Sequence, residues 1–334
     1  MSEMRIVAGT AMALGGVVAL TQTASAAGEI TLYSGRGETL VNPIIDVFEA
    51  ETGITVNVRY GGTAELAVLI QEEGEASPAD VYWAQDGGAL GQLALDDMFA
   101  VLPGDIYDDL PDIYTSETGT WVATSGRARV LAYSPDRADE FPDTIFDLED
   151  AHYGDRFGWA PTNGSFQAFV TAMRVTHGDD RTREWLEAVH ANGAQQFENN
   201  TALVQAIANG EIDYTITNNY YLSRFLEDDA DFPVSQRFFE PGDTGNLVNV
   251  AGAGILATSD NQDDALAFIE YLLSEPAQQF FTSDVYEYPV VGSVERNPDL
   301  EPFDVLLESA PEIDLDQLED LDGTLDLLRE VGLL

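Results

Sequence analysis

The chain contains no cysteine, and this absence excludes disulfide bonds, thiolate metal sites and cysteine nucleophiles. Basic residues are also scarce, because 14 Lys and Arg stand against 60 Asp and Glu, for a formal net charge of −46. Binding to nucleic acid requires Lys and Arg to neutralise phosphates, so this balance argues against nucleic acid as a partner. The sequence also lacks the G-x-G-x-x-G, P-loop and G-x-S-x-G patterns of dinucleotide sites, nucleotide sites and serine hydrolases.

Acidic residues are spread over the whole sequence and are not gathered in one tail. We interpret them as a solvated surface adapted to high salt, where charge repulsion is screened, and therefore expect a halophilic source. A calcium-binding surface is the competing interpretation, but no EF-hand loop pattern occurs. Since 45% of the residues are hydrophobic, the chain has enough apolar surface for a folded core.

The N-terminal segment has the pattern of an export signal. An apolar run at 6–20 follows a short polar start and precedes Ala24-Ser25-Ala26, a small-x-small cleavage pattern. We expect residues 1–26 to be a signal peptide and the mature protein to be extracytoplasmic, in the periplasm or at the cell surface. An uncleaved anchor is the alternative, because Arg5 is the only basic residue before the apolar run.

Strand and helix patterns alternate through the first hundred residues. Alternating strand patterns occur at 29–33, 54–60 and 79–84, and each is followed by a glycine-bearing loop and a helical pattern, at 38–51, to 73 and to 99. This order predicts an α/β fold with mostly parallel sheets and helices on both faces. Ligands of such sheets bind at the carboxyl ends of the strands, which here end in the loops 34–37, 61–63 and 85–88.

Two strand patterns, at 121–133 and 249–258, are expected to cross between two lobes. The length of 334 residues also favours two domains. We expect lobe 1 at 27–125, completed by about 255–285, lobe 2 at 126–254, and a C-terminal helical tail at 286–334. Two crossing strands predict a hinge between the lobes.

The stretch Asn218-Asn219-Tyr220-Tyr221 follows a strand pattern and precedes a helical one. It predicts two tyrosines in the first turn of a helix, with Asn218 as the N-cap. A phenolate forms near neutral pH only beside a strong cation, and a pair of phenolates suits a hard ion such as Fe(III). The alternative is that Tyr220 and Tyr221 are ordinary half-buried aromatics.

Other polar residues stand at predicted helix starts and could surround an oxyanion. They are Thr162, Asn163, Gly164, Ser165, Asn200 and Asn218. Each of them, taken alone, is equally explained as a helix cap. Arg127 and Arg129 stand out in a chain with so little positive charge, because a guanidinium can bind a small oxyanion through two bonds. Surface ion pairing with the abundant acid is the alternative for both.

Five segments taken together resemble the ferric-ion-binding proteins of iron ABC transporters, within the type II periplasmic binding protein fold. The segments are 30–36, 48–54, 77–82, 125–130 and 218–222, the last reading Asn-Asn-Tyr-Tyr-Leu. The resemblance implies that Tyr220 and Tyr221 are iron ligands and that carbonate or phosphate completes the site. It also implies that Arg36, Arg127, Asn200, Asn218 and the Thr162–Ser165 helix start contact this anion.

The sequence departs from the family pattern at three positions. The first loop has Arg36 and Gly37 where some members have histidine, and Gln85 and Asp86 stand where some have glutamate. Phe166 takes the place of a third tyrosine. Asp86 and Gln85 are therefore the candidate replacements among the metal ligands, and the remaining positions are left to the anion, water or a chelate.

These observations together predict an extracytoplasmic receptor for Fe(III) that closes on iron and anion and delivers them to a membrane ABC permease. We expect a monomer and a binding protein, not an enzyme. One alternative keeps the fold but binds a small organic or anionic solute, such as a polyamine, thiamine or a phosphonate. A more distant alternative is a secreted hydrolase that uses paired carboxylates.

Overall fold

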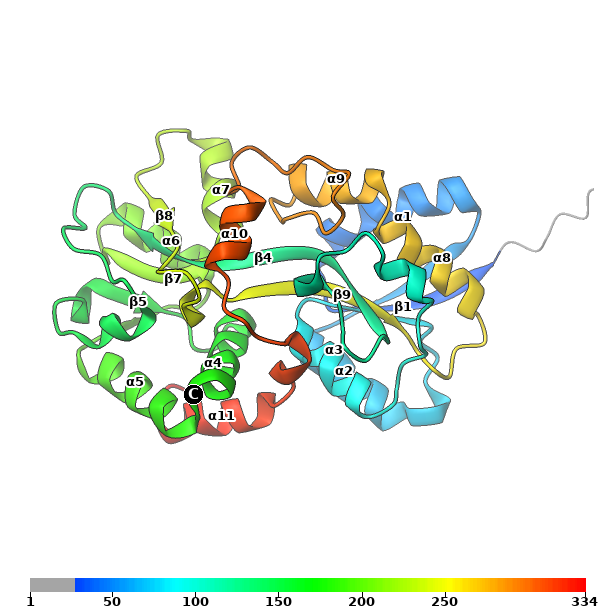
Figure 1. The fold of residues 1–334 in the computed structure, drawn as a ribbon, viewed down its shortest axis with the longest axis horizontal. Coiled ribbons are helices and arrows are strands. Elements are labelled where there is room, and N and C mark those ends of the chain that lie inside the picture. The colour runs from blue at the N-terminus through cyan, green and yellow to red at the C-terminus, as the bar shows by residue number, and fades with distance from the viewer. Residues whose placement is uncertain (1–27) are drawn as a thin grey trace, which may run out of the picture.

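The computed structural model describes residues 28–334, which form two α/β halves joined by long strands (Figure 1). The strands form one continuous path in the order β2-β1-β3-β9-β4-β7-β5-β6, and β8 pairs with β4. The predicted signal peptide lies outside the described residues. No helix within 28–334 combines the length and the apolar character needed to span a membrane.

The first half is built from parallel strands and the helices that follow them. Its elements are β1 (Glu29–Ser34), α1 (Glu38–Thr52), β2 (Thr55–Tyr60), α2 (Thr63–Glu73), β3 (Val81–Ala84) and α3 (Gly87–Leu95). β1 pairs in parallel with both β2 and β3, as the alternating pattern predicts. α1 buries Val41, Ile44, Ile45 and Phe48, and ends where Gly53 adopts a left-handed conformation. α3 ends at Leu95, earlier than the predicted 99.

Two antiparallel strands cross the middle of the molecule, as expected. They are β4 (Trp121–Tyr133) and β9 (Val248–Ile255), which run between the two halves in Figure 1. β9 pairs with β3 in the first half and with β4 along its length. The far part of β4 pairs with β7 and β8. The chain therefore passes through this pair of strands between the halves, whereas the residue boundaries predicted for the lobes stay a prediction.

The second half repeats the strand-then-helix arrangement. Its elements are β5 (Phe157–Trp159), α4 (Gly164–His177), α5 (Asp179–Ala191), β6 (Gln195–Gln196), α6 (Asn200–Asn209), β7 (Tyr214–Asn218), α7 (Tyr220–Asp228) and β8 (Ser235–Arg237). β5 is parallel to β6 and β7, so the loops after β5 and β7 lie at the same sheet edge. α4 and α7 begin at this edge.

The C-terminal region returns along both halves. It contains α8 (Gln262–Leu272), α9 (Glu275–Ser283), α10 (Phe303–Ser309), a 3₁₀ turn (Leu315–Leu318) and α11 (Leu321–Glu330). A break separates α8 from α9, and Pro276 lies in the first turn of α9, where its missing N–H is tolerated. The C-terminal segment expected to be helical at 286–334 contains α10 and α11, which are separated by the 3₁₀ turn.

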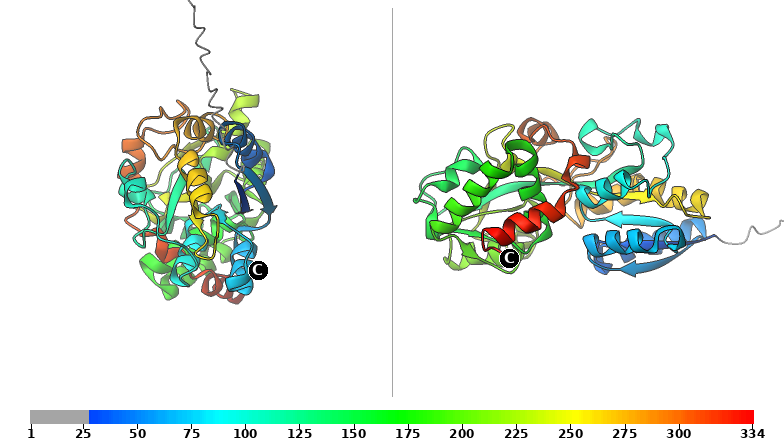
Figure 2. Two further views of the ribbon diagram at one scale, coloured as in Figure 1. Left: turned by 90° about the vertical axis from the view of Figure 1, so that its right-hand side faces the viewer. Right: turned by 90° about the horizontal axis from the view of Figure 1, so that it is seen from below.

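The tail contacts both halves beside their junction (Figure 2). The 3₁₀ turn packs on α3 so closely that a Cβ on Gly88 would lie 2.4 Å from the Leu318 carbonyl oxygen. The Asp316 carboxylate accepts a 2.7 Å hydrogen bond from the Trp121 indole. On the other side, Thr324 of α11 hydrogen-bonds Thr171 of α4 at 2.8 Å. The tail therefore joins the two halves through contacts additional to the crossing strands.

Candidate metal and anion site

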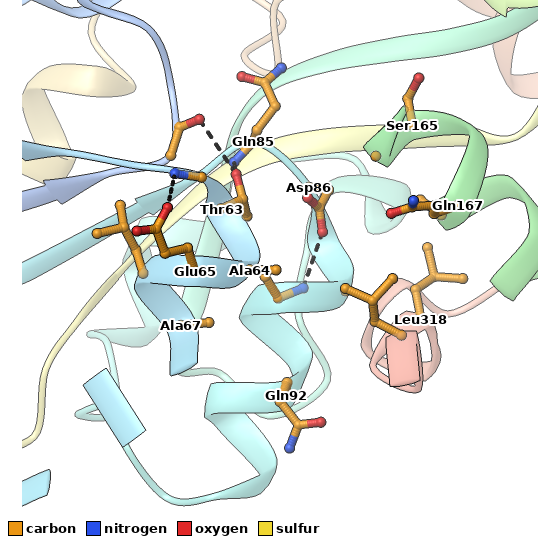
Figure 3. A pocket seen from close by; sticks show the side chains of 18 of the residues that line it. Thr63, Ala64, Glu65, Ala67, Gln85, Asp86, Gln92, Ser165, Gln167 and Leu318 are labelled. Carbon is orange, nitrogen blue, oxygen red and sulfur yellow. Dashed lines mark hydrogen bonds between the residues drawn. The ribbon is translucent and has the colours of Figure 1, made fainter. Parts of the chain in front are cut away.

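A cleft of about 1250 Å³ lies between the halves, and its walls are helix starts and the loops before them. Figure 3 shows Asp86 just before α3, Gln92 on α3, Ser165 and Gln167 on α4, and Leu318 of the tail beside them. The loops that follow the carboxyl ends of β1, β2 and β3 form one wall of the cleft. The loops after β5 and β7 form the other wall, as the rule for ligand sites in α/β sheets predicts.

Tyr220 and Tyr221 both line this cleft, side by side at the start of α7. Their ring centroids are 4.4 Å apart and the rings are inclined by 32°. Tyr220 is buried, with 6% of its surface exposed, and Tyr221 is half-buried. Neighbours on a helix normally point about 100° apart, yet these two rings lie close together at the start of α7.

The predicted N-cap at Asn218 is wrong. Asn218 is the last residue of β7, and its amide nitrogen lies 3.5 Å from the Tyr220 hydroxyl. Asn219 takes the N-cap position but makes no side-chain cap bond. Its Oδ1 instead accepts the Ala128 backbone N–H at 3.0 Å, and its own N–H donates to the Ala128 carbonyl. This cross-strand pairing with β4 fixes the backbone from which the tyrosines project.

The pKa of Tyr220 is raised well above its ordinary value, mainly because the phenol is buried. The Tyr221 hydroxyl acts in the same direction. Arg127 partly opposes this rise. The Tyr220 phenol therefore stays protonated without a metal, and a metal that binds it has to displace the proton. A metal that bound this phenol would have to offset that cost through a strong electrostatic gain, which a highly charged cation supplies.

The start of α4 holds a hydrogen-bonded polar cluster. Asn163 is the N-cap, and its side-chain oxygen accepts bonds from the Ser165 N–H at 3.0 Å and the Ser165 hydroxyl at 2.6 Å. Asn200, in the first turn of α6, donates to the Ser165 hydroxyl at 3.1 Å. Asn163, Gly164 and Ser165 line the cleft, whereas Thr162 is exposed and outside its lining.

Asn200 lies behind this cluster and does not line the cleft. It is 1% exposed, and its Oδ1 is buried without a hydrogen-bond partner. The N-cap of α6 is Asn199 and not Asn200, because the Asn199 side chain accepts the Ala202 N–H at 2.9 Å. Asn200 thus orients Ser165, and it would not itself contact a ligand in the cleft.

The two arginines predicted to hold an anion occupy different environments. Arg127 lines the cleft, donates one hydrogen bond to the Gln85 carbonyl oxygen, and has a second terminal nitrogen buried without an acceptor. Arg36 is outside the cleft lining and fully buried. It pairs with Glu287 at 2.9 Å and donates to Ser125 at 3.1 Å. The structure therefore places Arg127 where an anion could reach it, and places Arg36 in an internal ion pair.

Gln85 and Asp86 both line the cleft opposite the tyrosine helix. Asp86 caps α3 by accepting the Ala89 N–H at 3.1 Å, and burial raises the pKa of its carboxyl, with Arg127 partly opposing the rise. Among residues 28–334 no three His, Cys, Asp or Glu side chains form a metal-ligating group. A metal in the cleft would therefore depend on the phenols and at most on an isolated carboxylate.

Arg129, which the sequence marked together with Arg127 as a possible oxyanion ligand, lies outside the cleft lining and contributes to the site only through its contacts with neighbouring residues. It lies two residues after Arg127 on β4, donates to the Ser165 carbonyl at 3.0 Å and to the Ile216 carbonyl at 3.1 Å. Burial lowers the pKa of Arg129 to about 9, while the neighbouring Tyr221 and Tyr220 hydroxyls act in the opposite direction. Arg127 and Arg129 are two residues apart on one strand, so their side chains lie on the same face of the sheet. This spacing could have assigned both arginines to one site.

The sequence analysis missed Arg224 and Glu287. Arg224 lines the cleft three residues after Tyr221, a spacing that puts two side chains on one helix face. Glu287 interacts with the site through Arg36 and Arg127. Burial raises the pKa of its carboxyl, but the charges of the two arginines act against burial and help to hold this pKa below the ordinary value. No local sequence signal points to Glu287.

Comparisons with known proteins agree with this architecture. The "Major ferric iron-binding protein" of Neisseria meningitidis serogroup B is 31% identical over 94% of this chain and 96% of its own length. Iron-bound HitA from Pseudomonas aeruginosa superposes with a TM-score of 0.84 at 32% identity, covering 91% of this chain and 99% of HitA. The Trichodesmium protein IdiA (FutA), solved with iron and citrate ligands, superposes with a TM-score of 0.80 at 27% identity, covering 92% and 100% of the two chains.

The fold is that of the type II periplasmic binding proteins, which confirms the predicted fold class. Residues 33–279 match the family described as bacterial extracellular solute-binding proteins. This match spans most of the described chain, including every strand that lines the cleft. The chain therefore belongs to the bacterial extracellular solute-binding protein family.

Proposed function

We propose that this protein is an extracytoplasmic receptor that binds Fe(III) in the cleft and delivers it to an ABC permease in the membrane. The observation that supports this most strongly is the pair Tyr220 and Tyr221 at the cleft wall, with rings 4.4 Å apart. The relatives named as ferric iron-binding or iron-bound proteins cover nearly the whole chain. In this role the protein binds and releases its cargo and performs no catalysis.

A small anion, carbonate or phosphate, completes the proposed site. Arg127 has a buried donor without an acceptor, which supports its role as the anion's main contact. The α4 start at Asn163, Gly164 and Ser165 offers backbone N–H groups and the positive end of a helix dipole. Asn218 lines the same wall. Three of the predicted anion contacts take no direct part in this arrangement: Thr162, Asn200 and Arg36. An additional oxygen ligand for the metal comes from the opposite wall, from Gln85 or Asp86.

Ligands on both walls give the cleft a reason to close. Tyr220, Tyr221 and the α4 start belong to the second half, whereas Gln85 and Asp86 belong to the first. Cargo that contacts both halves binds the closed form more tightly and shifts the population toward it. We further propose that the protein is a monomer and that its lobes divide near residues 126 and 254. We also propose that residues 1–26 are its export signal.

A visible absorption spectrum tests the proposal directly. The purified protein, in high salt with bicarbonate or phosphate, is titrated with a soluble ferric chelate. A tyrosinate-to-iron charge-transfer band that saturates at one iron per chain supports Fe(III) on phenolates. If no band forms with either anion supplied, the proposal fails, and a small organic solute on the same fold becomes the better assignment.

Iron affinity is expected to fall as the pH falls. Protons compete with iron for two phenolates, whose unperturbed pKa lies near 10. Burial raises the pKa of Tyr220 further, which strengthens the competition. Dissociation constants measured between about pH 7 and pH 4 should rise steadily toward acid. Affinity that stays constant over this range would contradict phenolate ligation.

Arg127→Gln should weaken binding of the anion and, because the anion completes the site, binding of iron. The substitution removes one charge-assisted hydrogen bond, so the anion concentration for half-maximal formation of the iron band should rise by about tenfold or more. Arg296→Gln is the matched control, since Arg296 forms no ion pair with any residue of 28–334 and lies outside the cleft lining. An unchanged anion requirement in Arg127→Gln would remove Arg127 from the site.

A further inference from the structure

The C-terminal tail passes between the two halves more than once on its way from α10 to α11 (Figure 1). The end of α10 is held by the second half, because the Ser309 carbonyl accepts the Gly242 N–H at 3.0 Å and the Asn246 side-chain amide at 3.0 Å. The chain then contacts the first half at Asp316 and returns to the second half at Asp320. The tail is therefore attached to the two halves alternately.

The Asp316 carboxylate anchors the tail to the first half by accepting hydrogen bonds from three groups. The donors are the Trp121 indole at 2.7 Å, the Ser116 hydroxyl at 3.0 Å and the Glu117 N–H at 3.1 Å. A Cβ at Gly91 of α3 would lie 2.8 Å from the Asp316 carbonyl oxygen, so the tail backbone lies directly on this helix. Since Trp121 is fully buried, this anchor is fixed to the core of the first half.

Arg174 of α4 anchors the tail to the second half. Its guanidinium pairs with the Asp320 carboxylate at 2.8 Å, and it donates to the Asp320 carbonyl and to the Thr324 hydroxyl, each at 3.0 Å. Thr324 is fully buried and also shares a 2.8 Å hydrogen bond with Thr171 of α4. The start of α11 is therefore fixed to α4.

The segment between these anchors is short and consists of Gln317, Leu318 and Glu319. Leu318 and Glu319 line the cleft, so this segment is part of its wall. A 3₁₀ turn rises about 2.0 Å per residue, so the four steps from Asp316 to Asp320 cover about 8 Å. A fully extended chain of that length reaches at most about 14 Å. The two anchors can therefore move apart by about 6 Å before one of them breaks.

We propose that residues 316–320 are a strap that limits the opening of the cleft. Hinge motion about the crossing strands separates the halves, and the strap permits only the small separation that its length allows. Leu318 is buried, so stretching the strap also exposes apolar surface. Wide separation therefore requires release of the Asp316 anchor or of the Arg174 anchor. This inference goes beyond the proposed function, because it holds for any cargo of the cleft.

Distances between spin labels on the two halves test the strap. The chain has no cysteine, so Leu95→Cys at the end of α3 and Val175→Cys on α4 place one label on each half at exposed positions. Pulsed electron paramagnetic resonance is recorded in high salt without added iron, bicarbonate or phosphate. The intact strap should give a narrow distance distribution. Asp316→Ala and Arg174→Gln, which each release one anchor, should each add distances longer by about 6 Å or more.

A longer strap separates the effect of its length from the effect of its anchors. Inserting Gly-Gly between Glu319 and Asp320 keeps both anchors and adds about 7 Å of reach. The labels should again report longer distances, while the urea midpoint of unfolding stays near that of wild type. This variant carries the test if an anchor variant fails to fold.

Asp80→Ala is the matched control. The Asp80 carboxylate also accepts hydrogen bonds from three groups, but all of them belong to the first half. They are the Thr31 N–H at 2.7 Å, the Ser259 hydroxyl at 2.6 Å and the Asn261 amide at 3.2 Å. This control should lose stability and keep the wild-type label distance. Unchanged distances in the anchor and insertion variants would overturn the inference, as would an equal lengthening in Asp80→Ala. Because no iron is present, neither result bears on the proposed iron function.

Discussion

Replacing Tyr220 and Tyr221 together by phenylalanine should abolish the ferric charge-transfer band and reduce Fe(III) affinity by far more than 100-fold. Residues that only hydrogen-bond to metal ligands already contribute about 10- to 100-fold to metal affinity, and this change removes two proposed direct ligands. The rings stay, so packing around Tyr220 and the stacking of Arg224 are retained. Each single variant should shift the band and weaken iron binding. The measurement is a spectroscopic titration with competition from a chelator of known affinity.

Tyr271→Phe is the control for this prediction. Tyr271 is half-buried on α8, where its ring packs against Phe48 at 5.5 Å between centroids, and it is outside the cleft lining. The control should bind iron as wild type does. Circular dichroism and urea unfolding of the double variant should match wild type, since it loses only two hydroxyls. A double variant that binds iron with unchanged affinity would rule out the tyrosine pair as the metal site.

Removing the buried partner of Arg36 should cause the largest loss of stability. Arg36 and Glu287 are both essentially unexposed and pair at 2.9 Å, and Ser125 donates to the same carboxylate at 2.5 Å. Glu287→Ala leaves Arg36 as an uncompensated buried charge, which typically costs about 3–5 kcal/mol. The free energy of unfolding, measured by urea titration in high salt, should fall by that amount.

An exposed ion pair is the matched control. Arg183 and Glu330 also pair closely, at 2.7 Å, but their side chains are 36% and 60% exposed to solvent. Glu330→Ala should therefore change the free energy of unfolding by less than about 1 kcal/mol. Equal effects of the two substitutions would show that burial of the Arg36 pair contributes nothing to stability.

The pH dependence of the Glu287 contribution has a definite sign. Arg36, Arg127 and the hydrogen bond from Ser125 hold the pKa of Glu287 below its ordinary value, against the effect of burial. The stabilisation is therefore fully present above the ordinary pKa of about 4.3 and is lost as the pH falls through the folded-state pKa. The difference in stability between wild type and Glu287→Gln should shrink toward acid. A difference that grows toward acid would contradict a depressed pKa.

Local patterns in the sequence were sufficient for most helices and strands of the first half and for the α/β class, whereas the type II periplasmic fold was expected from the family resemblance. The 3.6-residue spacing of Val41, Ile44, Ile45 and Phe48 predicted α1 and its buried face, and alternation predicted β2. These signals act over a few residues, because a helix face or a strand face is defined by neighbours along the chain. The position of Tyr220 and Tyr221 at a helix start is local in the same sense, and it was predicted correctly.

Only the tertiary structure decided which polar residues face the cleft. Arg36 and Arg127 both follow patterns compatible with anion binding, but Arg36 meets Glu287, which is 251 positions later in the chain. Asn218 and Asn219 are equally good caps by residue type, and the pairing of β7 with β4 determined their roles. A polar side chain binds either a ligand or another part of the protein. That choice depends on which distant segment packs against it, and no spacing rule within one segment contains this information.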